Sequence, residues 1–234
     1  IFGTIGGGNL EYLVIDEARK LIDNNIANKV MNIPLGPGIG QCCGGYVQVK
    51  LSLHNNSKDA LKNEYVVNNI KPNLYIFGSG HIGQALISKL ENINFNTFII
   101  DSREDYLKMT NIKDVNYLLS KKPWEIVSKL EDNSYFIVLT HSHDYDLKIL
   151  NEILKKNNTF VGLIGSLTKK KRFYKRLIDN GHNKSIVDKI ECPIGIDIGN
   201  SKDPNEIAFS IITRIISIKN SLKHLSNNKI KEVI

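Results

Sequence analysis

From residue 74 onward, the hydrophobic positions follow two alternating patterns. Short apolar runs occupy residues 74–77, 97–100, 115–119, 135–139 and 160–164, and segments of helical period such as 82–90 and 147–154 separate most of them. Apolar runs of this length indicate strands buried on both faces, and their alternation with helices is typical of a parallel sheet. The pattern predicts an α/β fold with a Rossmann-like, doubly wound parallel sheet over residues 74–220.

The first 62 residues predict a smaller α+β domain. Asn9 precedes a stretch that we expect to form a helix capped by this residue, with apolar positions at helical spacing: Leu10, Leu13, Val14, Ala18, Leu21 and Ile22. Residues 29–34 and 46–54 are expected to be strands. The predicted organisation is a domain at 1–62, a loop-rich linker at 63–73, the sheet domain at 74–220 and a basic tail at 221–234. Because the chain begins at Ile1 without methionine, we expect the first domain to be incomplete at its amino end.

The last predicted helix has a clear start. Asp203 suits the N-cap position, Pro204 fits the first turn, and Glu206 lies where a capping box needs an acidic residue. The apolar residues cover much of its circumference, so we expect it to be well buried: Ile207, Phe209, Ile211, Ile212, Ile215, Ile216 and Ile218.

Composition narrows the class of protein. With 41% hydrophobic and 24% charged residues, the 234-residue chain is ordinary for a globular protein. No apolar run approaches the ~20 residues that span a bilayer. Three cysteines are too few for a disulfide framework, which favours the cytoplasm. The net charge of +7 is concentrated at residues 169–176, but aromatic residues are sparse there and no nucleic-acid motif is present. The basic run is therefore either a solvated helix face or an anion-binding surface.

A glycine-rich turn follows the first strand of the sheet. Its residues include Gly78, Gly80, His81 and Gly83, and an acidic residue, Asp101, closes the next strand. This spacing is typical of a nucleotide-binding turn in which backbone N–H groups at a helix start hold phosphate and the carboxylate accepts from ribose. We expect a side chain at position 80 or 83 to block the phosphate with little effect on folding. His81 is either a ligand contact or a helix cap.

Two further clusters follow the fourth and fifth strands. His141, His143 and Asp146 come after the fourth strand, where they could bind a metal, move protons or, for Asp146, simply cap the next helix. Gly165 and Ser166 come after the fifth, ahead of a basic helix that includes Lys170 and Arg172. Lys169 is expected on the same basic face. Because these loops share the carboxyl edge of the sheet, they predict a crevice for a phosphorylated, anionic ligand.

Two adjacent cysteines, Cys42 and Cys43, lie in a glycine-rich loop between the two predicted strands of the first domain. Adjacent side chains on an extended segment point to opposite faces, so the pair is a poor disulfide. The loop either contains two small buried hydrophobes or presents a thiolate to a metal or a sulfur donor.

The chain resembles the XdhC/CoxI family of xanthine dehydrogenase accessory factors. The resemblance rests on the order of its motifs, at residues 3–11, 36–45, 78–83, 140–146, 161–173 and 193–208. The sequence departs from the family pattern at its amino end, where we expect the usual strand and turn upstream of Gly3 to be missing. It also departs in a slightly longer segment at 200–203 and in a cysteine, Cys192, before the Pro-Ile-Gly motif.

This resemblance implies a molybdenum-cofactor chaperone more than a turnover enzyme. Such a factor binds the molybdopterin cofactor, promotes its sulfuration with a cysteine desulfurase and delivers it to a molybdenum hydroxylase apoenzyme, usually as a homodimer. It would place Cys42 or Cys43 near molybdenum and leave His141, His143 and Asp146 to orient ligand or transfer protons. The alternatives are an NAD(P)-dependent oxidoreductase, which explains the glycine turn but not the cysteine loop, and a scaffold that has lost its ligand.

Overall fold

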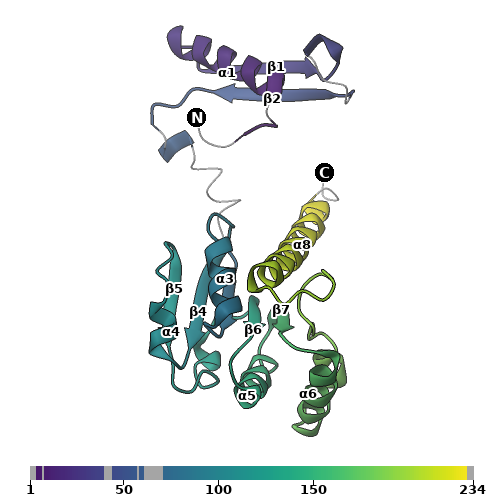
Figure 1. The fold of residues 1–234 in the computed structure, drawn as a ribbon. Coiled ribbons are helices and arrows are strands. Elements are labelled where there is room, and N and C mark those ends of the chain that lie inside the picture. The colour runs from purple at the N-terminus through teal and green to yellow at the C-terminus, as the bar shows by residue number, and fades with distance from the viewer. Residues whose placement is uncertain (1–3, 7, 40–43, 57, 61–70, 231–234) are drawn as a thin grey trace. The chain divides into compact units, whose positions relative to one another are not determined.

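The computed structural model describes residues 4–6, 8–39, 44–56, 58–60 and 71–230. The chain divides into two compact units, Ile1–Ile70 and Lys71–Ile234. Both units are drawn in Figure 1.

The first unit packs one helix on a hairpin. Helix α1 (Gly8–Asp23) lies against strands β1 (Asn28–Pro34) and β2 (Tyr46–Ser52), which pair antiparallel, and a short helical turn, η1 (Pro37–Ile39), follows β1. The ladder continues to a hydrogen bond from the Leu35 N–H to the Gly45 carbonyl, 2.9 Å long. That bond closes the loop in which Cys42 and Cys43 lie, and both cysteines are outside the described residues.

The expected cap of α1 is wrong. The helix begins at Gly8, so Asn9 lies within its first turn and does not precede it. Leu10 and Val14 are buried, whereas Leu13 and Ile22 are 40% and 62% exposed. A two-stranded hairpin covers only a narrow stripe of a helix, which leaves apolar residues beside that stripe in solvent.

The second unit contains the predicted parallel sheet. Its strands are β3 (Asn73–Phe77), β4 (Asn96–Asp101), β5 (Val115–Leu119), β6 (Ser134–Val138) and β7 (Asn158–Leu163), and their order is β5-β4-β3-β6-β7. All neighbours pair parallel. The Rossmann-like fold is therefore confirmed, with the order of strands reversing between β3 and β6.

Helices cover both faces of this sheet (Figure 1). On one face, Leu74 and Ile76 of β3 pack with α3 (His81–Lys89), α4 (Glu104–Lys108) and α8 (Pro204–Ile230). On the other, Tyr75 and Phe77 pack with the short turn η2 (Val127–Lys129), α5 (His143–Ile153), α6 (Leu167–Asp179) and α7 (Lys184–Val187). Successive residues of a strand point to opposite faces, so a continuous apolar run supplies both cores.

Helix α8 begins as predicted but differs in two details. The Asp203 carboxylate accepts from the N–H of Asn205 at 2.7 Å and of Glu206 at 3.3 Å. Glu206 does not complete the capping box directly, because its carboxylate accepts from the Ser201 hydroxyl, which in turn accepts from the Asp203 N–H. Phe209, expected in the core, is 59% exposed and lies beneath the Lys89 ammonium.

The same helix runs through the expected boundary at residue 220 and ends at Ile230. The division at residues 62, 73 and 220 otherwise stays a prediction. In the described part of the chain, no helix combines the length and hydrophobicity that crossing a membrane requires.

Candidate functional site

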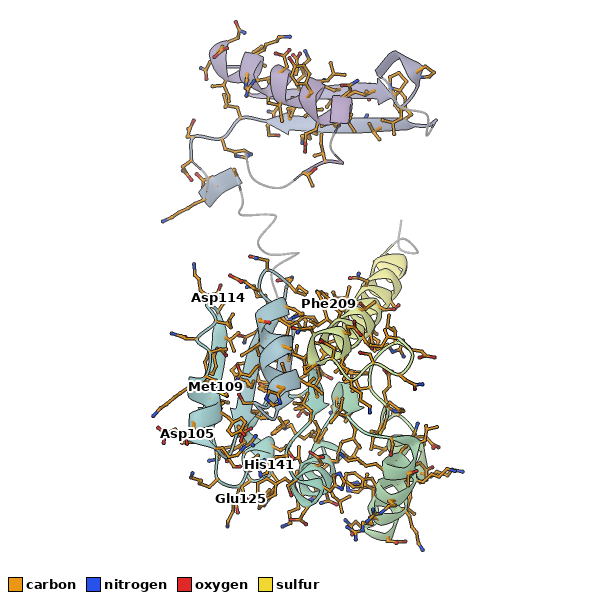
Figure 2. The ribbon with its side chains drawn as sticks, viewed as in Figure 1. Asp105, Met109, Asp114, Glu125, His141 and Phe209 are labelled. Carbon is orange, nitrogen blue, oxygen red and sulfur yellow. The ribbon has the colours of Figure 1, made fainter. Side chains whose placement is uncertain are left out.

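Most of the predicted site residues gather at one edge of the sheet. The loops after β3, β4, β6 and β7 leave the carboxyl ends of parallel strands, which all lie at the same edge. In Figure 2, His141 marks this end of the unit and Asp114 the opposite end. Parallel sheets bind ligands at their carboxyl edge, beside the point where the strand order reverses.

The glycines of the turn after β3 have different roles. Gly78 has φ +115°, and a Cβ there would lie 2.4 Å from the Leu139 carbonyl oxygen. A Cβ on Gly83 would lie 2.1 Å from the Gly78 oxygen, whereas one on Gly80 would meet nothing within 4 Å. The expectation that position 83 tolerates a side chain is therefore wrong, because Gly83 is required by packing. Gly80 alone adjoins open space.

The start of α3 offers unpaired donors beside that space. Gly80 occupies the N-cap position without a side-chain hydrogen bond, and His81 is exposed and does not cap the helix. Among the described residues, the N–H groups of Gly80, His81 and Ile82 have no acceptor. Such groups, together with the helix dipole, favour an anion.

Asp101 is already fully engaged. Its Oδ2 accepts from the Ser79 N–H at 2.7 Å and from Arg103 Nη2 at 2.9 Å. Its Oδ1 accepts from the Arg103 N–H at 2.9 Å and from Arg103 Nε at 3.0 Å. A carboxylate offers about four acceptor positions. The expected acceptance from ribose hydroxyls would therefore require one of these bonds to break.

These bonds also set the charge of Asp101. Burial would raise the pKa of this carboxyl, but the hydrogen bonds from the Arg103 guanidinium and from the Ser79 and Arg103 amides outweigh burial and lower the pKa below its usual value. The hydrogen bond to Asp101 raises the pKa of Arg103. The pair is thus an ion pair at neutral pH.

Arg103 is a residue at this edge of the sheet that the sequence pattern did not single out. Its guanidinium carbon lies 3.7 Å from the centre of the Tyr106 ring. The only sequence signal was a basic residue two positions after the acidic end of a strand.

Asp146 is engaged in a second buried ion pair. Its side chain has no exposed surface, and its Oδ1 accepts from the Thr140 N–H at 3.0 Å and hydroxyl at 2.6 Å. Its Oδ2 lies 2.7 Å from Lys169 Nζ, which also donates to the Ile164 carbonyl at 2.9 Å. Helix α5 is capped by Ser142, whose hydroxyl accepts from the Tyr145 N–H. The alternative that Asp146 is the cap is therefore wrong, and Lys169 points inward, away from the expected basic face.

The two histidines do not converge on Asp146. Both are exposed: the His141 ring lies beside Tyr145, with ring centres 5.4 Å apart, and the His143 ring lies beside Phe173 of α6 at 6.3 Å. Within the described ranges, no group of three or more histidine, cysteine, aspartate or glutamate side chains could hold a metal ion. The two histidines remain candidates for ligand contact, and their roles stay predictions.

The turn after β7 completes the edge. Ser166 caps α6 as expected, because its hydroxyl accepts from the Lys169 N–H at 3.2 Å. Arg172 is exposed and Lys170 half-buried. Burial raises the pKa of the Cys192 thiol, which lies 3.7 Å from the Gly165 carbonyl oxygen. A buried thiol of raised pKa is a poor nucleophile.

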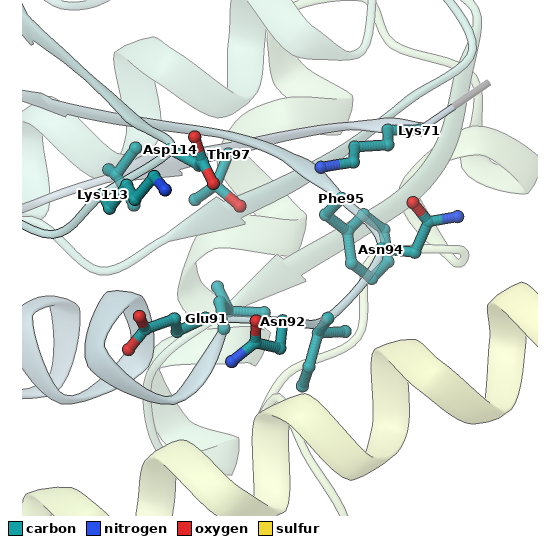
Figure 3. Close-up of a pocket in the computed structure, with 11 residues that line it drawn as sticks. Lys71, Glu91, Asn92, Asn94, Phe95, Thr97, Lys113 and Asp114 are labelled. Carbon is teal, nitrogen blue, oxygen red and sulfur yellow. The ribbon is translucent and has the colours of Figure 1, made fainter. Parts of the chain in front are cut away.

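Two of the cavities in this unit lie at different edges of the sheet. One, of about 480 Å³, adjoins the turn after β7 and is lined by Gly165, the segment 193–199 and the start of α8. The other, of about 160 Å³, lies at the amino edge, where Lys71, Lys113, Asp114 and Thr97 line it (Figure 3). Of these two, only the first is lined by a predicted site residue, Gly165.

The parallel sheet, its strand order and its glycine turn define a Rossmann-type domain. A family model described as the XdhC Rossmann domain matches residues 74–215. This match covers more than half of the chain, which therefore belongs to the XdhC family.

Two curated bacterial proteins are similar to the chain. The chain is 24% identical over 225 residues to YqeB, an uncharacterized protein of Escherichia coli, and 27% identical over 151 residues to a probable xanthine dehydrogenase component of Bacillus subtilis. These matches cover 94% and 64% of the chain but 39% and 43% of the relatives. The chain thus spans about two fifths of the length of the curated relatives it matches.

A solved structure shows the same fold. The crystal structure of a xanthine dehydrogenase from Bacillus halodurans aligns with a TM-score of 0.73 at 19% identity, covering 94% of this chain and 83% of that one. At this identity the likeness concerns the fold.

Proposed function

We propose that the chain is an accessory factor that binds the molybdenum cofactor and supports its sulfuration and insertion into a xanthine dehydrogenase-type molybdenum hydroxylase. The observation that carries the proposal is the XdhC family match over residues 74–215, which spans the whole carboxyl edge of the sheet. A cysteine desulfurase and the hydroxylase apoenzyme are the proposed partners, and the proposed assembly is a homodimer.

The described residues suit this cargo. The molybdenum cofactor carries a phosphate and a soft molybdenum–dithiolene centre. The phosphate would lie against the N–H groups of Gly80, His81 and Ile82, beside open space. The cavity of about 480 Å³ next to Gly165 falls in the usual size range for small-molecule sites. Lys170 and Arg172 add positive charge near the start of α6.

The proposed chemical role falls to the cysteine loop. A thiolate is both a soft metal ligand and a sulfur nucleophile. Cys42 or Cys43 would attack the outer sulfur of a cysteine persulfide on the desulfurase, so that the persulfide S–S bond breaks, a new S–S bond forms on this chain and the desulfurase thiolate leaves. Alternatively, the same thiolate would protect the molybdenum centre. Cys192 is unsuited to this role, because its thiol is buried and its pKa raised.

Single alanine variants of the three cysteines test the proposal. We expect Cys42→Ala or Cys43→Ala to impair activation of the apo-hydroxylase while the melting temperature stays near wild type. Cys192→Ala is the matched control, for which we expect a stability loss of about 1 kcal/mol and normal activation. If the Cys42/Cys43 double variant activates the hydroxylase at the wild-type rate, the loop is structural and the mechanism fails.

A second measurement tests the cargo itself. The absorbance of the protein after anaerobic reconstitution with molybdenum cofactor, compared with an NAD(P)H titration, separates a cofactor chaperone from an NAD(P)-dependent oxidoreductase. Retention of cofactor without NAD(P)H binding is expected. Binding of NAD(P)H alone would favour the oxidoreductase, and binding of neither would leave a scaffold.

A further inference from the structure

Arg103 occupies an unusual position beside the glycine turn. In Rossmann domains that bind dinucleotides, an acidic residue at the end of the second strand commonly accepts from ribose hydroxyls. Here that residue is Asp101, which is 3% exposed and accepts four hydrogen bonds, all from Ser79 and Arg103. The group that the ligand would meet at this strand end is therefore a cation.

The Arg103 guanidinium has N–H groups that donate to no described acceptor. Of the five N–H groups of an arginine side chain, Nε and one N–H of Nη2 donate to Asp101. The other three have no acceptor in the described part of the chain, and the side chain is 28% exposed. Lys121 adds a second cation nearby, because its ammonium donates to the Ser102 carbonyl.

The guanidinium is also fixed in place. One of its faces stacks on the Tyr106 ring, and the Tyr106 carbonyl accepts from the Ser79 hydroxyl at 2.9 Å and from Gln84 Nε2 at 2.8 Å. Ser79 and Gln84 belong to the turn and to α3. The arginine and the N–H groups of that helix start are thus held by one network. Fixed donors lose less entropy on binding a ligand.

We infer that Arg103 is the specificity-determining residue of the crevice and that it recognises a phosphate monoester on the bound ligand. Guanidinium and phosphate match in a bidentate geometry, with strong charge-assisted hydrogen bonds. A ribose without phosphate loses its usual acceptor here, since Asp101 is occupied. The inference rests on the proposed crevice of the accessory factor. Two ligands supply this chemistry, the molybdenum cofactor and the 2′-phosphate of NADP(H).

The first experiment needs no variant. Isothermal titration of the full chain with NADPH and NADH compares two probes that differ by one phosphate monoester, and anaerobic titration with molybdenum cofactor tests the other source. We expect at least one phosphorylated probe to bind, and NADPH, if it binds, to bind about tenfold or more tightly than NADH. Equal affinity for NADPH and NADH would overturn the inference.

The second experiment changes the residue. Arg103→Lys keeps the positive charge but removes the planar guanidinium that can bind phosphate through two parallel hydrogen bonds. We therefore expect about tenfold weaker binding of the phosphorylated probe. Arg214→Lys is the matched control, because Arg214 also pairs with a carboxylate, that of Glu191 at 2.7 Å. The affinity of the Arg214→Lys variant for the phosphorylated probe should match that of wild type. Thermal melts of both variants separate lost binding from lost folding.

The outcomes distinguish the two proposals. If molybdenum cofactor binds wild type and Arg103→Lys equally, the accessory role stands and the role of Arg103 is wrong. If only NADPH binds, and Arg103→Lys weakens it, Arg103 is confirmed and the accessory role fails. If neither the cofactor nor NADPH binds wild type, both are wrong.

Discussion

The loops that follow β3 and β6 are each held by a backbone hydrogen bond to a buried carboxylate, but the cations that pair with the two carboxylates differ in exposure. In each, the backbone N–H of the second residue after the strand donates to a buried carboxylate: Ser79 to Asp101 and Thr140 to Asp146. Each carboxylate also pairs with a cation, Arg103 or Lys169. A buried carboxylate needs such partners, because an unpaired charge away from water is costly.

The two cations differ in what they leave free. The Lys169 side chain is 10% exposed and is enclosed by Asp146, the Ile164 carbonyl and the Phe173 ring. The Arg103 side chain is 28% exposed and keeps three N–H groups without a described acceptor. One kind of ion pair can therefore enclose its cation in one place and leave N–H donors of its cation exposed in another.

Removing the charge of Asp146 should have the largest effect on the free energy of unfolding. We expect Asp146→Asn to destabilise the second unit by about 3–5 kcal/mol, because the buried Lys169 ammonium loses its counter-charge. Urea unfolding measures this change. The double variant Asp146→Asn/Lys169→Met should recover much of the loss, since it removes the unpaired cation as well.

A control lies on the same helix. Asp144 pairs with Lys148 in solvent, and Asp144→Asn should leave the unfolding curve almost unchanged. If Asp146→Asn is as stable as this control, the ion pair does not hold the loop and the contrast with Asp101 disappears.

Substitutions at Gly165 and Gly80 should show the next largest difference in stability. A Cβ on Gly165, whose φ is +157°, would lie 2.5 Å from Lys169 Cδ. Gly165→Ala should therefore displace the lysine and cost about 1–3 kcal/mol. Gly80→Ala, where the space is open, should cost little stability but weaken anion binding. Chemical denaturation of both variants checks the difference, and similar stability losses would contradict it.

Neutralising Asp101 should destabilise the second unit less than neutralising Asp146. We expect Asp101→Asn to cost about 1–2 kcal/mol at pH 7, less than Asp146→Asn, because the Arg103 side chain is 28% exposed and its charge stays partly solvated. The pKa of Asp101 is lowered in the folded state. Its contribution to stability is therefore fully present above the unfolded-state pKa of about 3.9 and is lost as the pH falls through the folded-state value.

Unfolding experiments at several pH values test this sign. The difference in stability between wild type and Asp101→Asn should be constant from pH 7 to about pH 5 and should shrink below about pH 4. A difference that grows on acidification would show that the carboxylate is not held in its charged form.

Local signals predicted much of the architecture and part of the site. The apolar runs placed five strands within a few residues of their observed bounds, and Ser166 and Asp203 proved to be helix caps. The glycine turn and the clusters after the fourth and fifth strands were located correctly at one sheet edge. The expectation for Phe209 failed, because its burial depends on which elements pack against α8.

The class of fold follows from the amino-acid order, because hydrophobic period, glycine and capping residues act within a few positions of the chain. The roles of the charged residues depend on the folded arrangement instead. The strand order β5-β4-β3-β6-β7 brings Ser79 to Asp101, 22 positions away, and Asp146 to Lys169, 23 positions away. Burial and pairing then fix the roles of these groups. Period and composition cannot reveal such pairs, since charges far apart along the chain meet only after the sheet has formed.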